Sequence, residues 1–192
     1  MSTEEEKVIS ARTNIGFWIY LMTDCVLFAS FFATYAVLKD AIAGGPSGHD
    51  IFEAPTALAE TLILLTSSFT AGMAFLAVKK KKTALFSIFA ALTAALGIAF
   101  LTIELSEFSA LIAEGHGWQQ SAFLSAFFSL VGLHGIHIAS GLFWLAVLLV
   151  VFIRRGYTAK FSRQFMLFTM FWHFLDLVWI FIFTVVYLLG VA

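Results

Sequence analysis

The chain has 192 residues, of which 61% are hydrophobic and 12% are charged, with 23 phenylalanines and a formal net charge of −1. Soluble domains carry about 25% charged residues, so this composition excludes an ordinary soluble fold and indicates an integral membrane protein. The single cysteine, Cys25, excludes an internal disulfide and a cysteine-based zinc or iron–sulfur site.

Five apolar segments follow one another, each long enough to cross a hydrocarbon layer about 30 Å thick as a helix. Residues 44–48, which are rich in turn-forming types, separate the first two segments. Only the lysines at 79–82 link the second and third segments, and so short a link predicts that these two helices are antiparallel neighbours. The sequence therefore predicts one all-α membrane domain with five transmembrane helices. They lie at about 15–38, 58–78, 84–112, 121–153 and 165–189, after a cytoplasmic tail at 1–14.

Basic residues divide unevenly between the two ends of these predicted helices. With the N-terminus in the cytoplasm, ten lysines and arginines face inward and only Lys39 faces outward. Because basic residues accumulate on the cytoplasmic side, this bias predicts a cytoplasmic N-terminus and a periplasmic C-terminus.

The last predicted helix carries an acid and a histidine near its centre. A charged side chain there costs about 2.5–3.5 kcal/mol even on the gentler insertion scales, so this face must turn toward protein. His173 and Asp176 are three residues apart, which places them on one face where they can pair. Asp24 is a second intramembrane acid. It fits a proton-relay carboxyl or a polar residue that locks two helices together, and both interpretations stay open.

Helix rise gives an approximate depth for each buried polar group. Asp24 and Asp176 fall in one layer near the midplane, together with His134 and His137. A second, outer layer contains three acids: Glu60, Glu104 and Glu107.

The two histidines of His134-Gly135-Ile136-His137 lie on one helical face, a spacing compatible with a metal or haem site. A haem between helices could use either of them with His173. The simpler interpretation, which we favour, is that each imidazole hydrogen-bonds a neighbouring helix or a lipid headgroup. We therefore predict no metal site and no catalytic residue.

Three stretches in this order carry a family resemblance: Glu104–Glu107, Gly132–Gly141 and Phe171–Phe181. From Gly16 onward the chain resembles subunit III of the haem–copper oxidases. The bacterial bo-type ubiquinol oxidase version is the most similar form. It resembles this chain in three features: five helices instead of seven, the stretch Gly16–Met22, and Gly44–Glu53 leading into Glu60-Thr61.

This resemblance implies a non-catalytic assembly and stability subunit of a proton-pumping terminal ubiquinol oxidase, which reduces oxygen to water in the bacterial cytoplasmic membrane. It places haem and copper on subunit I, so this chain would bind no cofactor of its own. It implies direct contact with subunit I, subunits II and IV in the same complex, no nucleic acid, and phospholipid held between the helices. The candidate lipid or inter-helix residues are Glu60, Glu107, His134 and His137. Asp24 stands where many relatives have a buried glutamate.

Other functions stay open at this point. A subunit III of a cytochrome c or menaquinol oxidase differs only in the electron donor. A small haem cytochrome would use His137 and His173. A proton-coupled transporter would use Asp24 and Asp176, but the helices lack the proline breaks typical of transporters, since both prolines lie in one loop.

Overall fold

The computed structural model describes residues 3–51 and 54–191, and within these residues all regular structure is helical. Its long helices are α1 (Thr3–Leu38), α3 (Ala54–Lys79), α4 (Thr83–Ala113), α5 (Ala122–Arg155) and α6 (Ala159–Ile182). The short α2 (Gly48–Ile51), the π-helix η1 (Phe183–Leu188) and α7 (Leu189–Val191) complete the chain. The prediction of an all-α fold with five long apolar helices is confirmed. However, α1 begins well before residue 15, and α2 forms inside the predicted loop.

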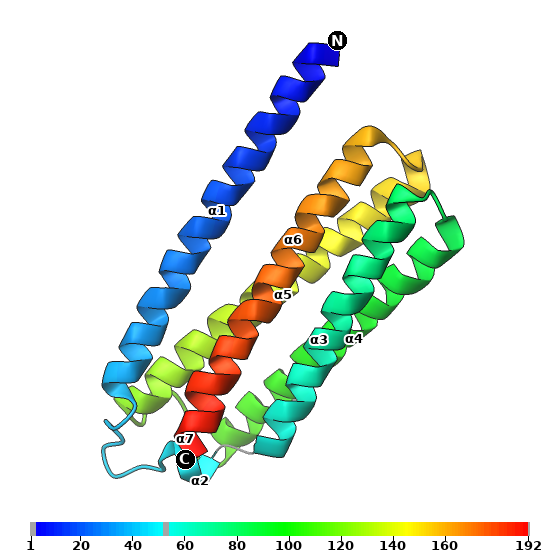
Figure 1. Cartoon of the computed structure of the whole chain (residues 1–192). Coiled ribbons are helices and arrows are strands. Elements are labelled where there is room, and N and C mark those ends of the chain that lie inside the picture. Colours follow the sequence, from blue (N-terminus) through cyan, green and yellow to red (C-terminus); the bar gives the residue numbers. More distant parts are fainter. Residues whose placement is uncertain (1–2, 52–53, 192) are drawn as a thin grey trace.

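Local signals at the helix ends produce two antiparallel hairpins, α3–α4 and α5–α6. The Ser121 side chain accepts the Leu124 N–H at 3.1 Å and caps the start of α5. Gly156, with φ 63°, ends α5 in a conformation that favours glycine. The Thr158 side chain then accepts the Phe161 N–H at 3.0 Å and starts α6. Both hairpin turns lie at the end of the bundle that also holds the start of α1 (Figure 1).

Helix α6 lies between α3 and α5 and supplies much of the buried core. Its two tryptophans are fully buried, and each donates its indole N–H to a hydroxyl on α3. Trp172 bonds Ser67 Oγ at 3.1 Å, and Trp179 bonds Thr61 Oγ1 at 3.1 Å. These bonds fix the rotation of α6 toward α3, so the α6 face that carries them points into the bundle, as its polar residues predict.

Helix α1 is the most peripheral of the long helices, and its N-terminal end stands away from the bundle (Figure 1). It packs mainly against α5, with α6 as a lesser neighbour. The buried side chains Leu21, Phe28 and Tyr35 recur every seven residues and form one stripe on this contact face. The rest of the helix surface is largely exposed, so α1 is held by a single narrow seam.

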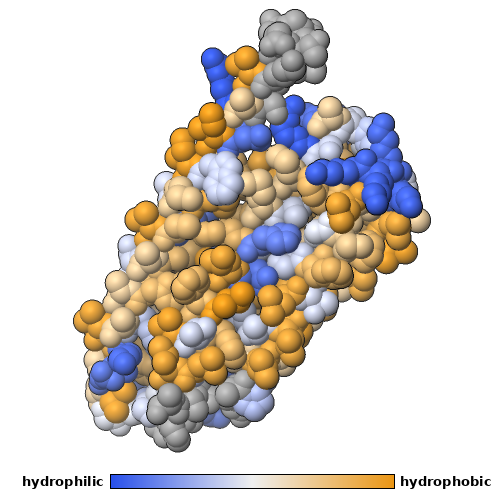
Figure 2. All heavy atoms as spheres, in the orientation of Figure 1, coloured by the Kyte–Doolittle hydropathy of each residue, from blue (hydrophilic) through white to orange (hydrophobic). Residues whose placement is uncertain are grey.

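Large apolar side chains cover the flank of the bundle, while hydrophilic residues gather beside the α3–α4 turn (Figure 2). Phe143 is 73% exposed and Ile153 is 81% exposed, both on α5. Soluble monomers rarely expose continuous apolar surface on this scale. By length and composition, five helices within the described residues can each cross a membrane. The chain is therefore a multi-pass membrane protein.

Candidate functional site

The intramembrane acid on α1 meets a histidine on α5. Asp24 Oδ1 lies 3.8 Å from His137 Nε2, and Asp24 is only 6% exposed. His137 Nδ1 is 2.8 Å from the Leu133 carbonyl oxygen, and because a carbonyl can only accept, the ring carries a proton on Nδ1. Phe28 covers the imidazole with its ring centroid 5.1 Å away, and the Tyr20 hydroxyl lies close to the carboxyl. This arrangement favours the helix-locking interpretation of Asp24.

The predicted partnership of His173 with Asp176 does not form an ion pair within the described residues. His173 Nδ1 donates instead to the Thr169 carbonyl oxygen, four residues back, at 2.7 Å, and its ring is exposed on the flank beside Gly72 of α3. Asp176 is buried and faces α3 near Ser68, although Oδ1 and the Ser68 hydroxyl each lack a hydrogen-bond partner of ordinary geometry. The two side chains stay within electrostatic reach of each other, but His173 bonds its own helix and Asp176 faces α3.

The predicted outer acidic layer is compact. Glu60 on α3 and Glu104 and Glu107 on α4 lie within electrostatic reach of one another. Tyr187 of η1 donates its hydroxyl to Glu107 Oε2 at 3.3 Å. The Glu104 carboxylate reaches α5 where Gly135 leaves space, since a Cβ there would lie 3.0 Å from Oε1. The layer therefore joins α3, α4, α5 and η1.

His134 is enclosed by aromatic rings from three helices. Its ring centroid lies 5.3 Å from Trp179, 5.8 Å from Phe100 and 6.4 Å from Phe28. The side chain has no exposed surface, and neither ring nitrogen has a hydrogen-bond partner in the structure. Phe28 contacts both imidazoles, but only His137 has a polar partner, at Asp24 and at the Leu133 carbonyl.

The described residues offer no group of three or more His, Cys, Asp or Glu side chains that could hold a metal ion. The imidazoles named for a haem cytochrome also have different neighbours, since His137 faces Asp24 and His173 lies in a groove on the flank.

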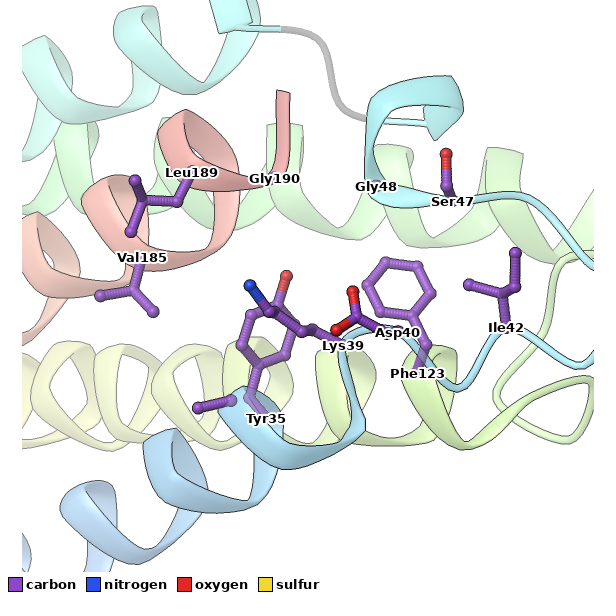
Figure 3. Close-up of a pocket in the computed structure, with 11 residues that line it drawn as sticks. Tyr35, Lys39, Asp40, Ile42, Ser47, Gly48, Phe123, Val185, Leu189 and Gly190 are labelled. Carbon is purple, nitrogen blue, oxygen red and sulfur yellow. The ribbon is translucent and has the colours of Figure 1, made fainter. Parts of the chain in front are cut away.

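A cavity of about 470 Å³ opens at the end of the bundle opposite the lysine turn. Figure 3 shows the side chains of Lys39 and Asp40 in this space, with Tyr35 and Phe123 as aromatic walls and Leu189 across from them. Its polar mouth and apolar walls suit an amphipathic ligand. We name it the Lys39 pocket.

A second concavity, which we name the flank groove, has a volume of about 540 Å³ and lies between α1 and α6. Its walls are almost entirely apolar and include Met22, Cys25, Phe174 and Leu177, with His173 as a polar group. Such a surface suits a hydrocarbon chain.

Sequence reasoning missed several polar partners because they sit across helix interfaces. Ser67 and Thr61 could have been flagged as hydroxyl residues in an apolar helix, but nothing in their spacing names a tryptophan as the donor. Tyr187 was also missed. It lies in a π-helix, whose altered register cannot be read from a 3.6-residue pattern.

The described residues form a membrane protein with five long helices, in which polar contacts such as Asp24–His137 and Glu107–Tyr187 join separate helical segments. The cytochrome c oxidase subunit III family model matches residues 1–191, and the chain belongs to this family. Cytochrome bo(3) ubiquinol oxidase subunit 3 of Pseudomonas aeruginosa is 56% identical over 179 residues, 93% of this chain and 86% of that protein. The same-named protein of Buchnera aphidicola subsp. Baizongia pistaciae is 41% identical, covering 96% and 95%. Cytochrome c oxidase subunit 3 of Bacillus sp. PS3 is 44% identical, covering 93% and 86%.

Proposed function

We propose that the chain is subunit III of a bo3-type terminal ubiquinol oxidase and acts as a non-catalytic assembly and stability subunit. The observation that carries this proposal is the 56% identity over 93% of the chain to a relative of that name. Direct contact with subunit I, and assembly with subunits II and IV, follow from the proposal. The exposed apolar surface along α5, which includes Phe143 and Ile153, is available for such contacts.

The test is a mild-detergent purification through a tag on this chain, followed by a subunit inventory and a reduced-minus-oxidised spectrum. We expect a large multi-helix partner and a haem signal, and no haem when the chain is expressed alone. A haem spectrum from the lone chain would instead favour the small cytochrome. Recovery of neither partner nor haem would favour a transporter or scaffold.

The electron donor is proposed from the more similar relatives. Relatives at 56% and 52% identity are named ubiquinol oxidase subunits, whereas a cytochrome c oxidase subunit is 44% identical and a Bacillus subtilis quinol oxidase subunit is 42% identical. The purified complex should therefore oxidise ubiquinol faster than reduced cytochrome c or menaquinol. Preference for reduced cytochrome c or menaquinol would instead favour subunit III of a cytochrome c or menaquinol oxidase.

The orientation is proposed from the placement of charge. The start of α1, the α3–α4 turn and the α5–α6 turn share one end of the bundle in Figure 1, and these segments hold ten of the eleven basic residues. By the positive-inside tendency, we propose that this end faces the cytoplasm and that the chain spans a bacterial cytoplasmic membrane. In a Cys25→Ala background, Gly45→Cys should react with a membrane-impermeant thiol reagent added to intact spheroplasts. Lys81→Cys should react only after lysis, and the reverse pattern would invert the topology.

Bound phospholipid is proposed at the Lys39 pocket and the flank groove. Lys39 and Asp40 offer charges of both signs to a zwitterionic headgroup, while Leu189 and Phe123 offer apolar contact below it. Lys39→Gln should reduce the phospholipid retained per purified complex, measured by mass spectrometry. Lys80→Gln, in the α3–α4 turn, serves as the matched control. Equal lipid content in both variants would remove the Lys39 pocket from the proposal.

A further inference from the structure

Among the described residues, three side chains hold half of the buried polar atoms that lack a hydrogen-bond partner. Both carboxyl oxygens of Glu60, Oε2 of Glu104 and both ring nitrogens of His134 are buried without a hydrogen-bond partner. Glu60 and His134 are 0% exposed, and Glu104 is 2% exposed. Buried polar groups in folded proteins are almost always hydrogen-bonded, so each such atom requires a partner.

These side chains come from three helices and are linked by packed neighbours. Trp179 contacts His134 and also packs against Phe100, one helical turn before Glu104, with ring centroids 4.7 Å apart. Glu60 is within electrostatic reach of Glu104. The residue after His134, Gly135, provides the space that receives the Glu104 carboxylate. The histidine is an independent sign of a missing partner, because it is not part of the acidic layer and is completely enclosed.

Three kinds of partner could satisfy these atoms, and two are disfavoured. A side chain from another subunit cannot reach Glu60 or His134, because this chain already covers them completely. A metal ion is disfavoured because the described residues contain no suitable group of three or more His, Cys, Asp or Glu ligands. Internal water remains, and polar sites of this kind regularly hold it.

A separate cavity lies near these buried side chains. Glu107, one turn along α4 from Glu104, lines a separate cavity of about 510 Å³ together with Glu114 and His116. That cavity lies beyond the acidic layer, toward the end of α4. Glu107 thus stands between the cavity and the buried carboxyls of Glu60 and Glu104.

We propose that Glu60, Glu104 and His134 bind a cluster of internal water molecules, and that this hydrated site exchanges protons with the aqueous phase past Glu107. A buried water makes about three hydrogen bonds, so five unsatisfied atoms correspond to about two waters. An uncompensated charge on the buried Glu60 or Glu104 would be costly, so we expect these carboxyls to bind protons. This site goes beyond an assembly role, because assembly alone requires no exchangeable protons.

The first test is an electron cryomicroscopy map of the complex purified through a tag on this chain, at a resolution that shows ordered water. We expect water density within hydrogen-bonding distance of the Glu60 and Glu104 carboxyls and of at least one His134 nitrogen. Direct hydrogen bonds among these side chains, with no density between them, would overturn the proposal. A density too large for water would also overturn it.

The second test is infrared spectroscopy of the same preparation in the carbonyl-stretching region of protonated carboxylic acids. Glu60→Gln and Glu104→Gln should each reduce this absorption, whereas Glu114→Gln, an exposed control, should leave it unchanged. In wild-type protein the absorption that depends on these two residues should shift after transfer to D₂O. Absorption insensitive to both substitutions, or unshifted after long incubation in D₂O, would contradict the exchange route. If a substitution prevents assembly, the water density in the wild-type map still tests the hydrated site.

Discussion

The indole ring of Trp172 packs against Gly97 and Gly141, and this contact allows a quantitative test of helix packing. A Cβ at Gly141 of α5 would lie 2.8 Å from Cζ3 of the indole, well inside ordinary van der Waals contact. The ring cannot easily retreat, because a Cβ position at Gly97 of α4 is already 3.0 Å from its Cζ2 edge, and Nε1 is bonded to Ser67. We expect Gly141→Ala to destabilise the protein by about 1–3 kcal/mol, the cost typical of an overpacked core.

The matched control is Gly132→Ala, also on α5, where a Cβ would meet only Phe108 Cε2 at an ordinary 3.7 Å. Both substitutions make the same change in backbone entropy, so the difference between them isolates the clash with Trp172. At about 1.4 kcal/mol per tenfold change, the predicted cost is about 5- to 140-fold in the ratio of folded to unfolded chain. Thermal unfolding of the purified protein in mild detergent would report it. Equal stability of the two variants would refute the conclusion that the indole ring is tightly packed and cannot move.

Other contacts give further expectations. Thr61→Val removes the acceptor of the Trp179 indole N–H and should cost about 1–3 kcal/mol in thermal unfolding, whereas Thr61→Ser should retain most of the stability. Asp24→Ala should loosen α1 by removing the partner of His137, seen as faster hydrogen exchange in α1 but not in α4. Asp24→Asn should keep most of the protection, and equal exchange in both variants would contradict the helix-locking role. Ser121→Ala removes the cap of α5 and should cost about 1 kcal/mol, with Ser121→Thr as a nearly neutral control.

The number and type of helices could be predicted because the bilayer constrains them strongly. A segment in hydrocarbon must satisfy its own backbone hydrogen bonds, so a long apolar run in an all-α protein becomes a helix. Helix ends were less predictable. Hydropathy indicates where a segment leaves the lipid, but α1 continues back to Thr3 through residues with good helix propensity, including Glu4–Glu6.

The polar contacts show what sequence spacing omits. A three-residue separation indicated that His173 and Asp176 share a face, and they do lie on the same helix. Spacing could not show that His173 would bond a carbonyl of its own helix while Asp176 turned toward α3. The pair that does form, Asp24 with His137, joins helices far apart in sequence. It depends on α1 lying beside α5, which no local pattern specifies.

The unequal distribution of polar contacts explains why α1 stands apart from the other helices. Lipid tails are as apolar as the side chains, so burial of apolar surface drives helix association only weakly in a membrane. Polar contacts and close packing between helices drive it instead. The α3–α4 interface has a buried hydroxyl bond between Thr70 and Thr93 at 2.8 Å, and α3 also accepts both tryptophan donors of α6. From α1, Asp24 reaches His137 of α5 at 3.8 Å, a longer contact than these hydrogen bonds. Consequently α1 is the helix whose position depends most on what surrounds it. A partner subunit packed on its exposed face would hold it more firmly than its own bundle does.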